Sequence, residues 1–217
     1  MGNTRNHALI HGQAITGVSD FSFSSCTKEA FELLPNKVIK QFDVIDYIAG
    51  LEHDVPYNSR PCQTFSPKVK DRLTTAADHG VNILVSGSYI GTDDSSTDDF
   101  VGNTLRFYQT GRKHINYNTP DSLYQAERVV KGLNISLPLL RLPNDRHYHA
   151  ADVDCIYPID AQGFSAFAYS DGRSAGIAWP GKRYRVIATG FPFECIDDSM
   201  IRMQSMKAFL HFLCRIR

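Results

Sequence analysis

One short segment constrains the fold of this chain more than any other. The residues from Asn82 to Ser86 are mostly apolar, and they lead into a turn bounded by Gly87 and Gly91. In α/β proteins, a buried strand that enters such a turn places the middle residue at the carboxyl edge of the sheet, facing whatever binds there. The middle residue here is Tyr89, where an enzyme of this geometry would carry Cys or Ser. The sequence therefore predicts a fold and a site, but it does not establish a reaction.

Helical and strand patterns alternate along the rest of the chain. Ser66 and Pro67 are typical of a helix start and Gly80 of a helix end, whereas residues 42–48 are rich in β-branched and aromatic side chains. Such alternation predicts an α/β three-layer sandwich with a mostly parallel sheet. The expected helices cover residues 4–15, 28–34, 67–79, 98–107 and 200–213, and the expected strands cover residues 20–24, 42–48, 81–86 and 184–189.

The pattern changes between residues 114 and 180. Short β-like pieces at 134–140, 164–169 and 175–179 are separated by Gly, Pro and Asp. This region is predicted to be a β-rich insertion or sheet extension within a single domain that spans residues 1–217.

Composition excludes several classes of protein. The 23 basic and 23 acidic residues balance, which argues against a general nucleic-acid binder. No apolar run reaches the roughly 20 residues that span a bilayer, and no signal peptide is recognisable at the start. The five cysteines are widely spaced and odd in number, so free and mostly buried thiols are expected.

Three stretches together resemble a known family. They are residues 42–50 (FDVIDYIAG), 84–93 (LVSGSYIGTD) and 190–196 (GFPFECI), with shorter likenesses at residues 2–4, 11–15 and 154–158. They resemble the carboxy-terminal flavodoxin-like domain of secreted Bacteroidetes proteins that are often labelled xanthan lyases. That domain is similar to the class I glutamine amidotransferase fold.

The resemblance covers most of the chain and carries several expectations. In the family a strand precedes the Gly2-Asn3-Thr4 element, so this chain is expected to be a fragment of a larger protein that lacks the first strand. The resemblance implies a periplasmic or extracellular protein, with glycan or neighbouring domains of the same polypeptide as partners. The lyase label is an inherited name, and nothing in the residues supports polysaccharide β-elimination.

Two of the family's three catalytic residues are replaced in this chain. The amidotransferase Cys falls on Tyr89, its His falls on Pro192, and only the orienting Glu is kept, as Glu194. A phenol with an ordinary pKa near 10 is a poor nucleophile, and proline cannot act as a base. The resemblance therefore implies a catalytically diverged domain that lacks glutaminase activity. The alternative is a hydrolase or polysaccharide lyase that uses Ser88 or Tyr89 with Glu194.

Several polar and aromatic residues are candidates for ligand binding around this turn. Residues 92–99 form an acidic, hydroxyl-rich loop that lacks the spacing of a calcium-binding loop. His147, His149 and Asp152 are weak candidates for a metal site, since no full ligand set is evident. No cofactor is expected, because neither a phosphate-binding loop nor a dinucleotide motif occurs. The ligand-binding candidates are Asp46, Ser86, Ser88, Tyr89, Asp93, Phe191 and Glu194.

Overall fold

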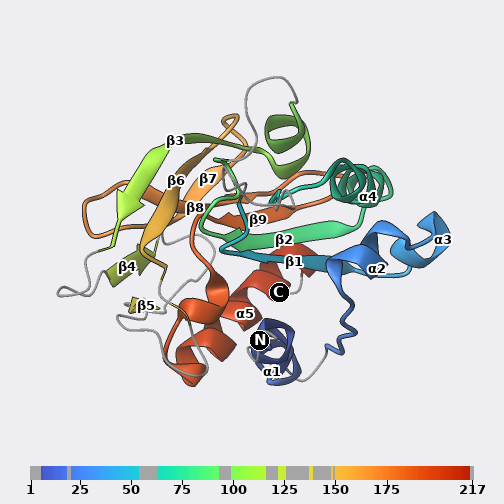
Figure 1. Cartoon of the computed structure of the whole chain (residues 1–217), viewed down its shortest axis with the longest axis horizontal. Helices are drawn as coiled ribbons and strands as arrows, with labels where there is room; N and C mark the ends of the chain where they lie inside the picture. Colours follow the sequence, from blue (N-terminus) through green and yellow to red (C-terminus); the bar gives the residue numbers. More distant parts are fainter. Residues whose placement is uncertain are drawn as a thin grey trace, which may run out of the picture.

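The computed structural model describes residues 6–18, 21–53, 63–92, 99–115, 122–125, 137–138, 148 and 150–215. Its helices include the π-helix η1 and the 3-10 helix η2, and its strands form two sheets (Figure 1). The helices are α1 (His7–Thr16), α2 (Lys28–Glu32), α3 (Asn36–Ile39), α4 (Pro67–Asp78), η1 (Val101–Leu105), η2 (Phe193–Cys195) and α5 (Ser199–Cys214). The strands are β1 (Val44–Gly50), β2 (Asn82–Gly87), β3 (Phe107–His114), β4 (Ser122–Gln125), β5 (Leu137–Pro138), β6 (Asp152–Pro158), β7 (Phe164–Ala168), β8 (Ser174–Trp179) and β9 (Val186–Thr189).

The main sheet is mixed. Its order is β1-β2-β9-β8-β7-β4-β5, with parallel pairing between β1, β2 and β9 and antiparallel pairing among the remaining strands. The predicted parallel arrangement therefore holds for the three strands outside the β-rich region. It does not hold for β8, β7, β4 and β5, where the strands lie in or beside the region predicted to extend the sheet.

Both faces of the sheet are covered, as an α/β sandwich requires. On β2, Leu84 packs with the core under α1 and α5, while Ile83 and Val85 pack with the core under α4 and η1. The period of two along the strand sends alternate side chains to opposite faces. Figure 1 shows α1 and α5 together on one side of the sheet and α4 on the other. The second sheet, made of β3 and β6, lies on the α4 side, where Phe107 and Ile156 join the same core.

The structure confirms the predicted ends of several helices and strands. Thr27 caps α2, and Ser66 caps α4 with Pro67 at its first position. Strand β1 runs to Gly50, whose φ of 58° ends it. The predicted strand, residues 42–48, ended two residues earlier, so Asp46 lies in the middle of β1 and not near its carboxyl end.

Two predicted elements differ in the structure. Residues 21–24 form no strand, although their apolar and polar side chains alternate, and residues 19 and 20 lie outside the described part. The helix expected over 98–107 is reduced to η1, because Arg106 adopts a left-handed φ of 65° and Phe107 begins β3. Strands β3 and β6 were not predicted as a pair, since their contact joins residues 38 (His114 and Asp152) to 51 (Phe107 and Pro158) positions apart.

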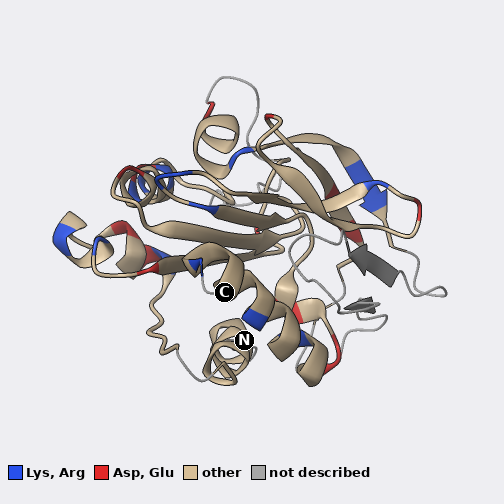
Figure 2. Ribbon diagram, turned by 180° about the vertical axis from the view of Figure 1, so that it is seen from behind, with Lys and Arg blue, Asp and Glu red and all other residues tan. Residues whose placement is uncertain are grey.

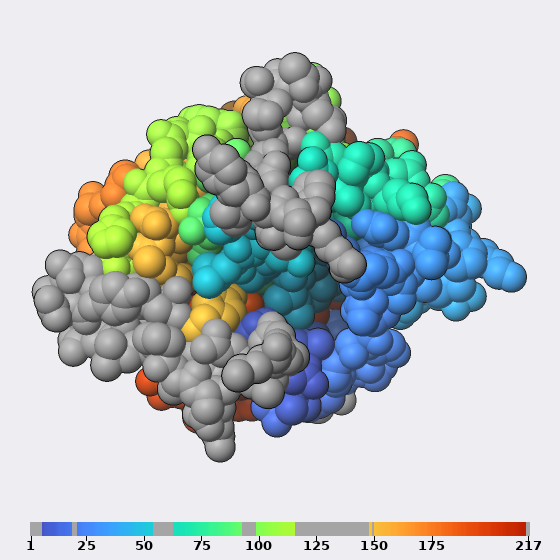
Figure 3. All heavy atoms as spheres, viewed as in Figure 1, coloured from blue at the N-terminus to red at the C-terminus, as the bar shows by residue number. Residues whose placement is uncertain are grey.

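Charged residues of both signs occur throughout the described part of the chain. Lys and Arg are interspersed with Asp and Glu along the ribbon (Figure 2), in keeping with their equal numbers in the sequence. In the space-filling view, residues of the 21–53 region and α4 gather at one end of the face, and β3 and β6 at the other (Figure 3). None of the helices in the described ranges has both the length and the apolar character needed to cross a membrane.

Candidate functional site

The turn after β2 is closely held by the end of β1. The backbone N–H of Ser88 donates to the carbonyl of Gly50 at 2.8 Å, and a Cβ on Gly87 would lie 2.8 Å from that of Ala49. The side chains of Ser86 and Ser88 are fully buried. Neither hydroxyl has a hydrogen-bond partner among the residues that the structure describes. Both serines were predicted as ligand-binding candidates, and both lie at the carboxyl end of β2.

Tyr89 is half-buried at the apex of the turn and is packed by two other side chains. The ring of His53 stacks on it with centroids 4.0 Å apart, and the guanidinium of Arg112 lies 4.1 Å from its centroid. The His53 contact is a ring stack and not a hydrogen bond to the phenol. This phenol therefore lies in an aromatic and cationic stack, without a described imidazole that could remove its proton.

Asp154 on β6 fixes the far side of the turn. Its buried carboxylate accepts hydrogen bonds from the N–H of Gly91 at 2.8 Å, the hydroxyl of Thr92 at 2.8 Å and the amide of Gln109 at 2.7 Å. Burial raises the pKa of Asp154 to about 6, because the loss of water outweighs these donors and the nearby Arg112. In the sequence, Asp154 belongs to the resemblance at residues 154–158, and its role in the turn is a structural one.

Glu194, from η2 just after β9, occupies the same edge of the sheet. Its side chain is 1% exposed. One oxygen, Oε1, accepts a hydrogen bond from the Tyr148 hydroxyl at 2.5 Å, and the other, Oε2, lies 3.3 Å from Nε2 of His11. Burial acts to raise the pKa of Glu194, but the hydrogen bond and charge of His11 and the Tyr148 hydroxyl lower it overall. Glu194 is therefore ionised at neutral pH.

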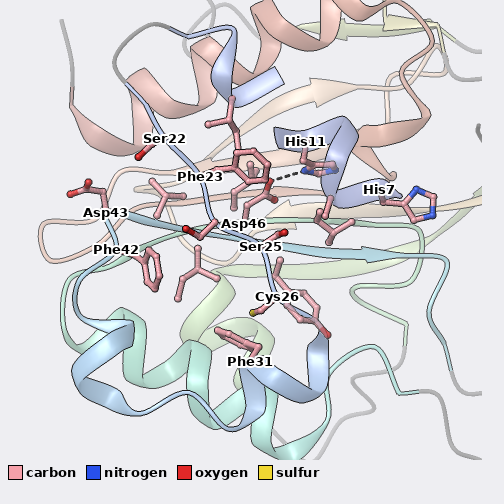
Figure 4. Close-up of a pocket in the computed structure, with 18 of the residues that line it drawn as sticks. His7, His11, Ser22, Phe23, Ser25, Cys26, Phe31, Phe42, Asp43 and Asp46 are labelled. Carbon is pink, nitrogen blue, oxygen red and sulfur yellow. Dashed lines mark hydrogen bonds and ion pairs between the residues drawn. The ribbon is translucent and has the colours of Figure 1, made fainter. Parts of the chain in front are cut away.

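His11 is the centre of a buried chain of charges. Its Nδ1 atom lies 2.7 Å from Oδ2 of Asp46 (Figure 4). Since Nε2 faces Glu194, the imidazole bridges the two carboxylates. Burial alone would lower the pKa of His11, but the two carboxylates outweigh it and raise the pKa to about 10. A protonated imidazole donates from both nitrogens, which matches its two carboxylate partners. His11 is thus an ion-pair partner at neutral pH and not a general base.

Tyr148 completes this cluster. Its hydroxyl donates to Glu194, and the ring of His7 meets it edge-on with centroids 5.0 Å apart. Burial and the charge of Glu194 raise the pKa of Tyr148, so the phenol remains a neutral donor. We refer to Asp46, His11, Glu194 and Tyr148 as the buried charge cluster.

The structure brings some predicted site residues together and separates others. Asp46 and Glu194 meet through His11, which the sequence offered only within the family resemblance at residues 11–15. The turn after β2 and Glu194 lie at the same edge of the sheet. A Cβ on Gly50, which contacts this turn, would lie 3.4 Å from Glu194 Oε1. Phe191 is fully buried and packs edge-on against Phe167, which is a core role.

The remaining candidates are Asp93, proposed for ligand binding, and the three weak candidates for a metal site. Asp152 bonds the exposed His114 at 3.1 Å, while Asp93, His147 and His149 lie outside the described residues. Within the described ranges, no group of three or more His, Cys, Asp or Glu side chains is placed to hold a metal ion. Of the cysteines in those ranges, Cys155 and Cys195 are buried, as expected, whereas Cys26 is exposed and Cys214 is partly exposed.

A cavity of about 1000 Å³ adjoins the buried charge cluster. It lies along β1, between α1 and the segment that leads into α2 (Figure 4). His11 and Asp46 line it, together with apolar side chains from both helix layers. No sequence pattern indicates this cavity, because it depends on how α1, β1 and α2 are placed relative to one another.

Comparison with known proteins gives similarity of fold. No protein-family model and no curated protein matches the sequence. Among solved structures, Cytoplasmic Protein STM3548 from Salmonella typhimurium superposes with a TM-score of 0.64 at 8% identity, over 93% of this chain and 85% of that one. Cytoplasmic Protein STM1381 from the same species gives a TM-score of 0.61 at 10% identity, over 95% and 85%.

A larger protein shares the fold over part of its length. The cold-adapted β-galactosidase from Rahnella sp. R3 superposes with a TM-score of 0.57 at 11% identity, over 94% of this chain but 26% of its own. The chain therefore spans about a quarter of that enzyme. At these identities the likeness shows that the chain has an α/β fold found both in small proteins and as one part of a glycosidase.

Proposed function

We propose that this chain is a catalytically diverged, amidotransferase-like domain that provides structural support or glycan-related binding within a larger protein. The observation that carries the proposal is the state of His11. The imidazole beside Glu194 is held between two carboxylates, with its pKa raised to about 10. An imidazole must be unprotonated to accept a proton, so His11 is not available as a general base at neutral pH.

The turn itself supports the same proposal. Tyr89 stands where the resemblance places a cysteine, and it packs against His53 and Arg112. In the described residues, no imidazole is hydrogen-bonded to the oxygen of Ser88 or Tyr89. Nucleophilic catalysis requires a base within hydrogen-bond reach of the nucleophile, and this geometry does not offer one.

The glycan part of the proposal rests on two supports. The fold occurs as about a quarter of a β-galactosidase, and the resemblance is to domains of secreted proteins with a polysaccharide-related label. A periplasmic or extracellular location belongs to the same proposal. The half-buried Tyr89 and its neighbour Arg112 offer an aromatic and polar surface of the kind that lines small-ligand sites.

A second candidate is a hydrolase or lyase that uses Ser88 or Tyr89 with Glu194. It is favoured by the Ser88 hydroxyl, which is buried without a described partner and could be reserved for a substrate. Because Ser88 is fully buried, such a substrate could reach it only if the turn opened.

Activity and binding measurements on the purified chain separate these candidates. We expect no glutamine hydrolysis, and we expect binding on a glycan array that weakens when Tyr89→Ala or Arg112→Ala is introduced. Tyr108→Phe, at an exposed ring, is the matched control. Hydrolysis of glutamine or of a glycan by the wild-type protein that is abolished by Ser88→Ala or Tyr89→Phe, but not by Tyr108→Phe, would establish an enzyme and overturn the proposal. If neither hydrolysis nor glycan binding is observed, structural support within a larger protein is the part of the proposal that remains.

A further inference from the structure

We propose that the cavity along β1 binds an organic cation, a small amine whose ammonium group pairs with Asp46 and whose apolar part packs against the rings around it. This inference does not depend on the proposed function, which concerns the turn at Tyr89. It rests on the carboxylate of Asp46, on the balance of charge beside it and on the side chains that line the cavity.

One carboxylate oxygen of Asp46 has no hydrogen-bond donor among the residues that the structure describes. Oδ2 lies 2.7 Å from Nδ1 of His11, whereas Oδ1 is buried and makes no hydrogen bond within the described ranges. Asp46 lines the cavity, and its side chain is 15% exposed. A buried carboxylate oxygen without a donor is costly, and a ligand N–H would satisfy it. Because Oδ1 itself is covered, an ammonium group reaches it after a small rotation of the side chain.

The charges beside the cavity favour a cation. Asp46 and Glu194 carry two negative charges, and the protonated His11 between them carries one positive charge. Lys28 and Glu52, also on the cavity wall, pair with each other at 2.8 Å, so their charges cancel. Opposite charges attract more strongly where water is scarce. An ammonium group near Asp46 would therefore offset the excess negative charge.

Aromatic rings from α2, from the segment before it and from the approach to β1 line the same cavity. They belong to Phe21, Phe23, Phe31 and Phe42. The ring of Phe23 packs closely on α1, because Gly12 leaves room for it and a Cβ at that position would overlap the ring. Figure 4 shows Phe23 beside His11 and Asp46. The face of an aromatic ring attracts cations, and aromatic surroundings of this kind recognise ammonium groups.

The rest of the wall suits the hydrocarbon part of an amine. Ile39 lines the cavity from one helix layer, and Met206 and Leu210 of α5 line it from the other. Phe23 and Phe42 are 40% and 38% exposed, so a bound ligand would cover apolar surface that now meets solvent. The volume of about 1000 Å³ lies at the upper end of the range usual for small-ligand sites, roughly 300–1000 Å³. The cavity therefore admits an amine that carries an aromatic ring or a short alkyl chain.

Titration calorimetry with phenethylamine and with phenethyl alcohol tests the proposal on the full chain. The two probes share a ring and a chain, but only the amine is charged at neutral pH. We expect the amine to bind at least about tenfold more tightly, because a hydrogen bond to a charged group and a cation–ring contact both favour it. Amide NMR shifts on binding should centre on residues 44–48. No binding of the amine, equal affinities for the two probes, or shifts confined to another part of the chain would overturn the proposal.

Two carboxylate variants separate pairing with Asp46 from general attraction. Asp46→Asn should weaken amine binding at least about tenfold and leave binding of the alcohol unchanged. Asp43→Asn, at an exposed carboxylate that lines the same cavity, should weaken amine binding by less than about threefold, since solvent screens this charge. Equal losses in the two variants would contradict the pairing with Asp46.

Two variants of α1 give a test that leaves the buried charge cluster unaltered. Ala8→Trp fills the cavity and should abolish amine binding. Leu9→Trp, at a side chain that is 50% exposed and does not line the cavity, should leave the affinity unchanged. Circular dichroism checks that each variant is folded, and this pair decides the question if Asp46→Asn does not fold. Binding of the amine to folded Ala8→Trp protein with the wild-type affinity would place the site elsewhere and overturn the proposal.

Discussion

The Nδ1 atom of His11 lies 2.7 Å from Oδ2 of Asp46, so a charged hydrogen bond joins helix α1 to strand β1 in the protein interior. The other ring nitrogen faces Glu194 at 3.3 Å. One positive charge is therefore shared between two carboxylates from different parts of the chain. Removing the positive charge of His11 leaves two negative charges in a site from which water is largely excluded.

Replacement of His11 should destabilise the fold strongly. His11→Gln removes the cation but keeps a side chain that can donate a hydrogen bond. We expect the free energy of unfolding to fall by about 3–5 kcal/mol, the usual cost of leaving a buried charge without its partner. Urea denaturation at pH 6 measures it. The control His114→Gln, at an exposed imidazole bonded to Asp152, should change stability by no more than about 0.5 kcal/mol.

Stability should also depend on pH through His11. Its pKa rises from 6.5 in the unfolded chain to about 10 in the folded protein. The stabilisation is therefore complete below pH 6.5 and is lost as the pH rises from 6.5 through 10, with a slope of at most about 1.4 kcal/mol per pH unit. Urea denaturation across this range should show the decline in the wild type and a flatter profile in His11→Gln. Parallel profiles would mean that His11 titrates normally.

The hydroxyl of Tyr148 should stabilise the fold through its hydrogen bond to Glu194. Tyr148→Phe removes the hydroxyl that donates to Glu194 Oε1 at 2.5 Å but keeps the ring that packs against His7. We expect a loss of about 1.5–3 kcal/mol, the range for a hydrogen bond to a charged group. Thermal and urea unfolding measure it, with Tyr108→Phe as the exposed control. An unchanged stability would show that Glu194 recruits another donor.

Gly190 should tolerate no side chain. An ideal Cβ at this position would lie 2.1 Å from the carbonyl oxygen of Asp154, and this atom belongs to rigid backbone. Gly190→Ala should therefore push β9 away from β6 and cost at least about 3 kcal/mol, toward the upper end for an overpacked core. At Gly102 the nearest atom to a Cβ is a side-chain carbon of Ile159 at 3.6 Å. Gly102→Ala should change the unfolding free energy by less than about 1 kcal/mol, by the same measurement.

Local signals explain what could be predicted. Ser66, Pro67 and Gly80 mark the ends of α4, because caps and turn residues act on their own backbone. The apolar run before Gly87 gives β2 and places Tyr89 at the end of a parallel strand. Glu194 was likewise expected at this edge, since carboxyl ends of neighbouring parallel strands lie side by side.

The sequence by itself determined the α/β class, the strand–turn at Tyr89 and the absence of a cysteine there, because each depends on residues that are close together in the chain. Only the tertiary structure decided that His11, Asp46, Glu194 and Tyr148 meet, and that a cavity lies along β1. These contacts join residues 35 to 183 positions apart. No local propensity encodes such contacts, because they follow from how helices and strands pack, and packing sums many weak interactions over the whole chain.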